Sequence, residues 1–166
     1  DLIVTGSNNS SVLITPDRCI NLGDLVLRAG RPVLVAAKGA TRVLTNTAVV
    51  AWKDTREARR AVADALPLLR KASEVIVVTV DCNADISTQE SVDGILGFLR
   101  RHGVKARSEI IKDKHESQSL MSFARAVDAE LVVSGAYGHS RLRELVFGGV
   151  TRSLLKEDGF SRFMSS

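Results

Sequence analysis

The sequence is poor in cysteine and aromatic residues, and it lacks a long apolar run. Its two cysteines, Cys19 and Cys82, stand far apart with no CxxC pair, which argues against a disulfide framework. No histidine has metal-ligand spacing either, so we expect no metal site. One Trp and one Tyr form no stacking platform for bases. No run approaches the roughly 18 apolar residues of a membrane helix, so we expect a cytoplasmic protein without a membrane partner.

The charge balance is mildly basic. Twenty-three Lys and Arg against nineteen Asp and Glu give a net charge of +4. This excess would suit an anionic ligand but is too small to predict nucleic acid binding. With 45% hydrophobic and 25% charged residues, the 166-residue chain has the composition and length of an ordinary globular domain.

Short β-branched runs alternate with longer stretches that have apolar residues at helical spacing, which predicts an α/β fold with a parallel sheet. The predicted strands of the main unit are 47–52, 74–80, 104–111, 130–134 and 160–165. Either Asp54 or Thr55 can cap the helix after the first strand. A capping box of Ser87 and Glu90 predicts the start of the next helix.

An internal repeat divides the chain. A shift of 129 residues places DLIVTG at 1–6 on ELVVSG at 130–135, with no gap needed. We therefore expect residues 1–37 to be the C-terminal β-α-β remnant of a first unit and 38–46 to be a linker. Residues 47–166 would form a complete second unit. The identical pairs include Leu2 with Leu131, Val4 with Val133, Gly6 with Gly135 and Gly30 with Gly159.

The segment GAYGHSRLRELVFGGVT at 135–151 begins where a predicted strand ends. Ligands of open parallel sheets sit at the carboxyl ends of strands, and glycine lets backbone N–H groups approach a phosphate. Neither GxxxxGK[ST] nor GxGxxG is present. From the residues alone, the glycines form either a phosphate site or ordinary turns.

Gly135-xx-Gly138, nine further residues and Gly148 resemble the nucleotide loop of the universal stress protein family. The phrase VVAWKDTREARRAVADALPLL strengthens the likeness, and the whole chain is similar to the second half of a bacterial tandem member. The resemblance implies a flavodoxin-like, adenine nucleotide alpha hydrolase-like fold, an open five-stranded sheet of order 3-2-1-4-5. It also implies ATP or another adenine nucleotide as ligand in many members.

Carried over by position, the resemblance assigns a nucleotide site. Gly135, Gly138 and Gly148 would face the phosphates. From its own position after the glycine turn, His139 either donates to a phosphate or has an ordinary surface or loop role. The residues that the resemblance implies near the adenosine are Ala51, Trp52, Lys53, Thr79 and Val80, and Asp54 joins them as a candidate because it follows Lys53, where Asp is frequent in the family.

Two positions depart from the family pattern. Gly149 stands where a Ser or Thr is usual, which leaves Thr151 as the hydroxyl that could reach in. Lys53 stands where Asp is frequent, with Asp54 one place later. A lysine cannot accept the hydrogen bonds of a carboxylate, but its charge favours a phosphate.

The leading expectation is a stress-response module that binds an adenine nucleotide and acts through self-association or partner binding. A structural pairing domain is the alternative, and slow ATP hydrolysis is a weaker one, because no catalytic trio or magnesium carboxylate can be assembled. The first unit has Asn9, Cys19 and Ile20 at the positions of Gly138, Gly148 and Gly149. Only the second unit should therefore hold a nucleotide.

The strands at 2–5 and 33–36 cannot form a stable sheet alone. We expect 33–36 to associate with 160–165 or with a second chain, as an intramolecular pseudo-dimer or a homo-oligomer.

Overall fold

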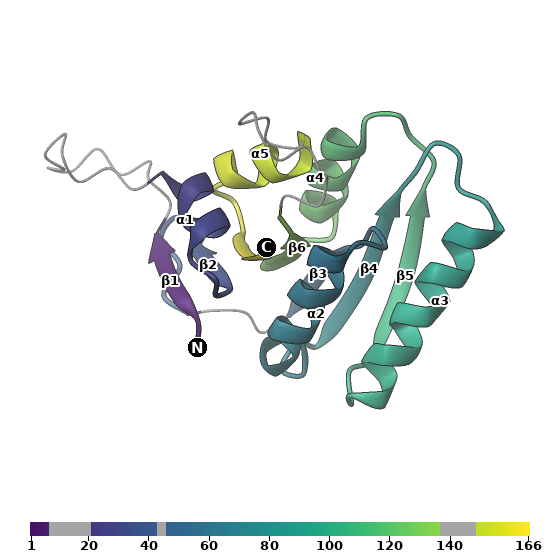
Figure 1. The fold of residues 1–166 in the computed structure, drawn as a ribbon, viewed down its shortest axis with the longest axis horizontal. Coiled ribbons are helices and arrows are strands. Elements are labelled where there is room, and N and C mark those ends of the chain that lie inside the picture. Colours follow the sequence, from purple (N-terminus) through teal and green to yellow (C-terminus); the bar gives the residue numbers. More distant parts are fainter. Residues whose placement is uncertain (7–20, 43–45, 137–148) are drawn as a thin grey trace, which may run out of the picture.

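The computed structural model describes residues 1–6, 21–42, 46–136 and 149–166, which contain alternating strands and helices (Figure 1). The strands are β1 (Ile3–Gly6), β2 (Val33–Ala36), β3 (Thr47–Ala51), β4 (Glu74–Val80), β5 (Ala106–Ile111), β6 (Leu131–Gly135) and β7 (Ser161–Ser165). The helices are α1 (Leu22–Arg28), α2 (Arg56–Leu69), α3 (Ile86–Arg101), α4 (Glu116–Ala126) and α5 (Gly149–Lys156).

All the described strands belong to one sheet of order β1-β2-β7-β6-β3-β4-β5. Read from β5 to β7, the strands of the main unit have the expected order 3-2-1-4-5, and their pairs are parallel. The sheet is larger than the five strands predicted for this unit, because β1 and β2 continue it. It is also not wholly parallel, since β2 pairs with β7 in the antiparallel sense.

Helices cover both faces of the sheet. One core cluster contains buried residues of α2 and α3, and the other contains residues of α1, α4 and α5. This arrangement explains the continuous apolar run of β4, in which residues 75–79 are all buried. A strand covered on both faces needs apolar side chains on both.

Two helix starts show how local chemistry selects a boundary. Thr55, one of the two candidates, caps α2 by accepting a hydrogen bond from Ala58 N at 3.3 Å. The predicted capping box of α3 is wrong by two residues. Asp85 is the cap and accepts from Thr88 N at 3.1 Å, while Thr88 Oγ1 accepts from Asp85 N at 3.4 Å. The Asp85 carboxylate is a charged acceptor that also accepts from Ser87 Oγ, so Ser87 supports the cap instead of forming it.

The antiparallel seam confirms that 33–36 associates with the last strand of the same chain. Leu34 lies opposite Phe163, with Val33 opposite Met164 and Val35 opposite Arg162. When each residue is replaced by its repeat counterpart, 129 positions away, the pair Val33–Met164 becomes Arg162–Val35, and the reverse. The pair Leu34–Phe163 becomes itself. The seam therefore has an approximate two-fold symmetry centred on Leu34 and Phe163.

Arg162 breaks this symmetry. It is fully buried and occupies the position that Val33 has in β2. Its Nη1 donates to the carbonyl of Phe160 at 3.1 Å, and its Nε and Nη2 have no partner among the described residues. Burial lowers the pKa of the guanidinium, while the nearby carboxylates of Asp158 and Glu157 oppose that shift.

Candidate functional site

The strand order places a topological switch point between β3 and β6. From β3 the chain continues to β4 and β5 on one side, and then crosses by α4 to β6 on the other side of β3. In open α/β sheets, ligands bind in the crevice at the carboxyl ends of the two strands that flank such a point. The described residues of the predicted nucleotide site lie at the ends of β3 and β6, at the end of the neighbouring β4 and in the first turn of α5.

At the end of β6, Gly135 packs against the first turn of α2. A Cβ atom on Gly135 would lie 2.5 Å from the amide nitrogen of Ala58 and 2.6 Å from the carbonyl carbon of Glu57. Because these are backbone atoms, no side chain fits at this position. Close packing thus accounts for this glycine and brings the end of β6 against the N-terminus of α2.

At the end of β3, Ala51 is partly buried and Trp52 points away from the surface. The Trp52 side chain belongs to the core with α2 and α3, and its Nε1 donates to Ser91 Oγ at 3.0 Å. Its amide donates to the carbonyl of Val78 at 2.8 Å. The indole is therefore held in the core rather than presented to a ligand.

The charged residues after β3 have protein partners. Lys53 Nζ lies 3.2 Å from Glu116 Oε1 at the start of α4, and Asp54 Oδ1 lies 2.7 Å from the Arg59 guanidinium. All four side chains are more than two-fifths exposed. Such exposed pairs contribute about 0–1 kcal/mol each. A phosphate could therefore compete for Lys53 at little cost.

At the end of β4, Thr79 is buried and its Oγ1 donates to the carbonyl of Trp52 at 3.2 Å. Val80 is partly buried in the core cluster beneath α4 and α5. The Thr79 hydrogen bond therefore links the end of β4 to the residue that follows β3. Ser91 and Glu116, which hold Trp52 and Lys53, were not identified from the sequence, because each lies more than thirty residues from its partner.

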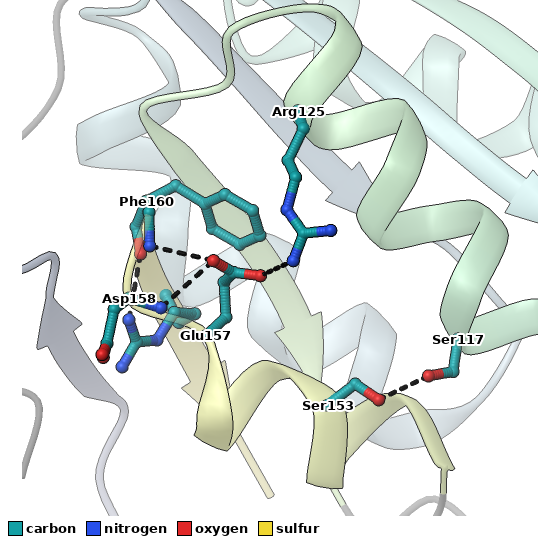
Figure 2. A network of polar contacts seen from close by, with 8 residues as sticks. Ser117, Arg125, Ser153, Glu157, Asp158 and Phe160 are labelled. Atoms are coloured by element: carbon teal, nitrogen blue, oxygen red, sulfur yellow. Dashed lines mark hydrogen bonds and ion pairs between the residues drawn. The ribbon is translucent and has the colours of Figure 1, made fainter. Parts of the chain in front are cut away.

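The N-terminus of α5 lies beside α4. Gly149 has room for a side chain, since a Cβ there would be 3.8 Å from Ser117 Cβ. Ser153 and Ser117 join the two helices through their hydroxyl oxygens, which lie 2.5 Å apart (Figure 2). Thr151 is buried, 5% exposed, and so is not presented at the surface. Gly138, His139 and Gly148 lie outside the described residues.

The loop before α4 carries a carboxylate with a lowered pKa. A hydrogen bond from the amide of His115, 2.9 Å long, and one from Ser119 Oγ, 2.7 Å long, keep the pKa of Asp113 below its ordinary value. His115 makes no side-chain cap bond itself.

Within the described ranges, no group of three His, Cys, Asp or Glu side chains could hold a metal ion. In the same ranges, every helix is too short or too polar to span a bilayer.

A hollow of about 540 Å³ lies at the opposite end of the central strands, where β6 and β7 begin. The residues after β2 form one side of it, and Arg125, Glu130 and Gly159 contribute to the other. None of the predicted site residues lines it.

The strongest likeness to other proteins is in three-dimensional structure. A universal stress protein from Archaeoglobus fulgidus matches 99% of this chain with a TM-score of 0.68 and 14% sequence identity. The chain has the fold of the universal stress proteins. A second structure from Archaeoglobus fulgidus, also a universal stress protein, matches 75% of the chain with a TM-score of 0.58 and 19% identity. UspA from Lactobacillus plantarum matches 76%, with a TM-score of 0.55 and 14% identity.

These universal stress proteins differ in length from the present chain. The present chain spans 60% of the first Archaeoglobus protein, and it covers the whole of the second Archaeoglobus protein and of the Lactobacillus protein. A search with protein-family models finds none that matches the sequence. A search of curated protein sequences finds no match either.

Proposed function

We propose that this chain is a cytoplasmic stress-response module that binds ATP or another adenine nucleotide and acts through association rather than turnover. The observation that carries the proposal is the position of the glycine-rich segment. It begins at Gly135, at the carboxyl end of β6, and leads to the N-terminus of α5. Gly135 lies at the switch point, and a position between the carboxyl end of a strand and a following helix supports a phosphate site built from backbone N–H groups and a helix N-terminus.

The surrounding residues support an anionic ligand. Lys53 is half-exposed at the end of the neighbouring strand, and its ion pair with Glu116 is weak enough to exchange for a phosphate. The space at Gly149 also matters, because the hydroxyl residue frequent in the family could be accommodated there. Gly149 therefore lacks the hydroxyl group that a Ser or Thr would offer to a phosphate, but the backbone there has room for such a side chain.

A second role is favoured by the seam between β2 and β7. The seam joins the two repeat units in one continuous sheet, with further bonds from Ala37 N to Ser161 Oγ and from Lys38 N to the carbonyl of Asp158, both 3.2 Å. Such a pairing domain needs no nucleotide. The two roles differ in one measurable property, which is nucleotide affinity.

Calorimetric titration with ATP, ADP, AMP and GTP tests the proposal. We expect adenine nucleotides to bind with a dissociation constant in the roughly micromolar range. Gly138→Val should abolish binding by placing a branched side chain in the loop. Asn9→Val, at the equivalent position of the first unit, is the matched control and should leave it unchanged. Absence of binding at millimolar ATP would leave only the pairing role, and phosphate release above the Gly138→Val background would contradict the absence of turnover.

A further inference from the structure

The seam between β2 and β7 joins two strands that differ in the size of their side chains. At each of the three paired positions, β7 has a larger residue than its repeat counterpart in β2. The counterparts are Arg162 and Val33, Phe163 and Leu34, and Met164 and Val35. All six side chains are at most 2% exposed, so each difference in size is accommodated inside the packed interior. The seam therefore combines a nearly symmetric register with unlike side chains.

The same register would pack poorly with two identical strands. Two copies of β7 would place Phe163 opposite Phe163, and Arg162 opposite Met164 on both sides of that centre. The larger residue would then stand at every position, and extra volume in a packed interior forces side chains out of their preferred rotamers. Two copies of β2 would instead leave the interior underfilled. Side-chain size thus favours β2 with β7 over either strand with itself.

Charge favours the same choice. The observed seam buries one guanidinium, and its Nε and Nη2 have no partner among the described residues. Buried donors without acceptors are costly. A seam of two β7 strands would bury two guanidiniums, because Arg162 would be present on both sides. Met164 would replace Val35 opposite each of them and would offer no carboxylate in return.

The carboxylates that support Arg162 belong to the second unit only. Glu157 and Asp158 lie near the guanidinium and favour its charged form. Their counterparts in the first unit are Arg28 and Ala29. An arginine at the position of Val33 would therefore meet a cation instead of two acids. The arginine position of β7 consequently has no workable equivalent in β2, and the two strands are not interchangeable.

We propose that β7 is selective for β2 of its own chain and excludes β7 of a second copy, with Arg162, Phe163 and Met164 as the selecting residues. The strand that fits β7 is antiparallel and has small apolar side chains at three successive positions, as β2 has at 33–35. Self-association of this chain then uses a surface other than β7. The inference concerns the pairing role and does not depend on nucleotide binding.

The main test gives β2 the residues of β7 within the 166-residue chain, through Val33→Arg, Leu34→Phe and Val35→Met together. Because the two strands stay in one chain, their effective concentration is high, and a strand that fails to pair here also fails between copies. We expect the melting temperature to fall by about 5–10 °C. Hydrogen exchange of the β2 amides should become about 100-fold faster. Leu27→Arg, which adds a positive charge at an exposed position of α1, is the control and should change neither.

Two further measurements separate size from charge. Leu34→Phe and Phe163→Leu should each lower the melting temperature by about 3–6 °C, and the two together should recover at least half of the summed loss, because they restore one large and one smaller residue. Arg162→Met keeps an unbranched apolar stem and removes the unpaired donors. We expect it to raise the melting temperature.

Three results would each overturn the proposal. The first is unchanged protection of β2 in the triply substituted chain, because β7 would then accept a strand like itself. The second is a simple sum of the two losses when Leu34→Phe and Phe163→Leu are combined. The third is a lower melting temperature for Arg162→Met, which would make the guanidinium a stabilising group. Nucleotide titration is a separate measurement, so failure of the nucleotide proposal would leave this test unaffected.

Discussion

The β1-α1-β2 unit and the β6-α5-β7 unit share one strand register but differ in what surrounds them. In the second unit, α2 and β3 complete the packing, and Leu131 and Val133 are fully buried. In the first unit, the identical Leu2 is 40% exposed and Val4 is 62% exposed. The comparison shows that register follows from the local sequence, whereas burial depends on a neighbour that the local sequence does not supply.

The largest difference in stability effect between the units should be seen at Gly6 and Gly135, the glycines at equivalent positions of the repeat. We expect Gly135→Ala to lower the free energy of unfolding by about 2–3 kcal/mol, because its methyl group would overlap α2 backbone atoms that cannot move aside. Gly6→Ala should change it by about 0.5 kcal/mol or less, since the space is open. Urea unfolding of both variants measures the difference, and equal losses would contradict the account of β6 packing.

The apolar positions should give a smaller contrast. Val133→Ala removes two methyl groups from a fully buried site, so we expect a loss of about 2 kcal/mol. Val4→Ala removes the same atoms from an exposed site and should cost about 0.5 kcal/mol or less. The midpoint of urea unfolding at an unchanged slope reports each value. A costly Val4→Ala would mean that residues 1–166 cover this face in solution.

The smallest effect concerns Glu157, whose counterpart in the first unit is Arg28. Partial burial acts to raise its pKa, but hydrogen bonds from Gly159 and Arg125 outweigh this, and the pKa lies below its ordinary value of 4.5. Figure 2 shows the contact between Glu157 and Arg125. A lowered folded pKa means that the stabilisation is present above the unfolded pKa and is lost as the pH falls through the folded value.

We therefore expect the Glu157 contribution, about 1 kcal/mol or less, to be lost below about pH 4.5. Glu157→Gln should reduce stability at pH 7 and flatten the acid limb of the stability curve. Glu90→Gln, on the exposed face of α3, is the matched charge control. Thermal unfolding from pH 3 to pH 7 measures the effect, and identical acid limbs for Glu157→Gln and the unsubstituted chain would argue against it.

Much of the architecture could be predicted because its signals are local. Apolar runs located the strands. The instability of an isolated strand pair, together with the family resemblance, predicted that 33–36 would pair with 160–165 or with a second chain, and the structure shows the first of these. The start of α3 was misplaced, because Ser87 with Glu90 and Asp85 with Thr88 both match a capping pattern, and only the folded backbone selects between them. The Lys53–Glu116 pair and the Trp52–Ser91 bond join distant segments, so sequence spacing gave no signal for either.

The sequence by itself determined the α/β alternation, the repeat and the position of the glycine segment after a strand, because each depends on residue type and spacing along the chain. Only the tertiary structure decided that Gly135 is required by α2, that Trp52 is a core residue and that Thr151 is buried. It also decided that Leu2 and Val4 are exposed while the identical Leu131 and Val133 are buried. Burial and steric exclusion depend on which elements meet in space, and a one-dimensional pattern does not specify those meetings.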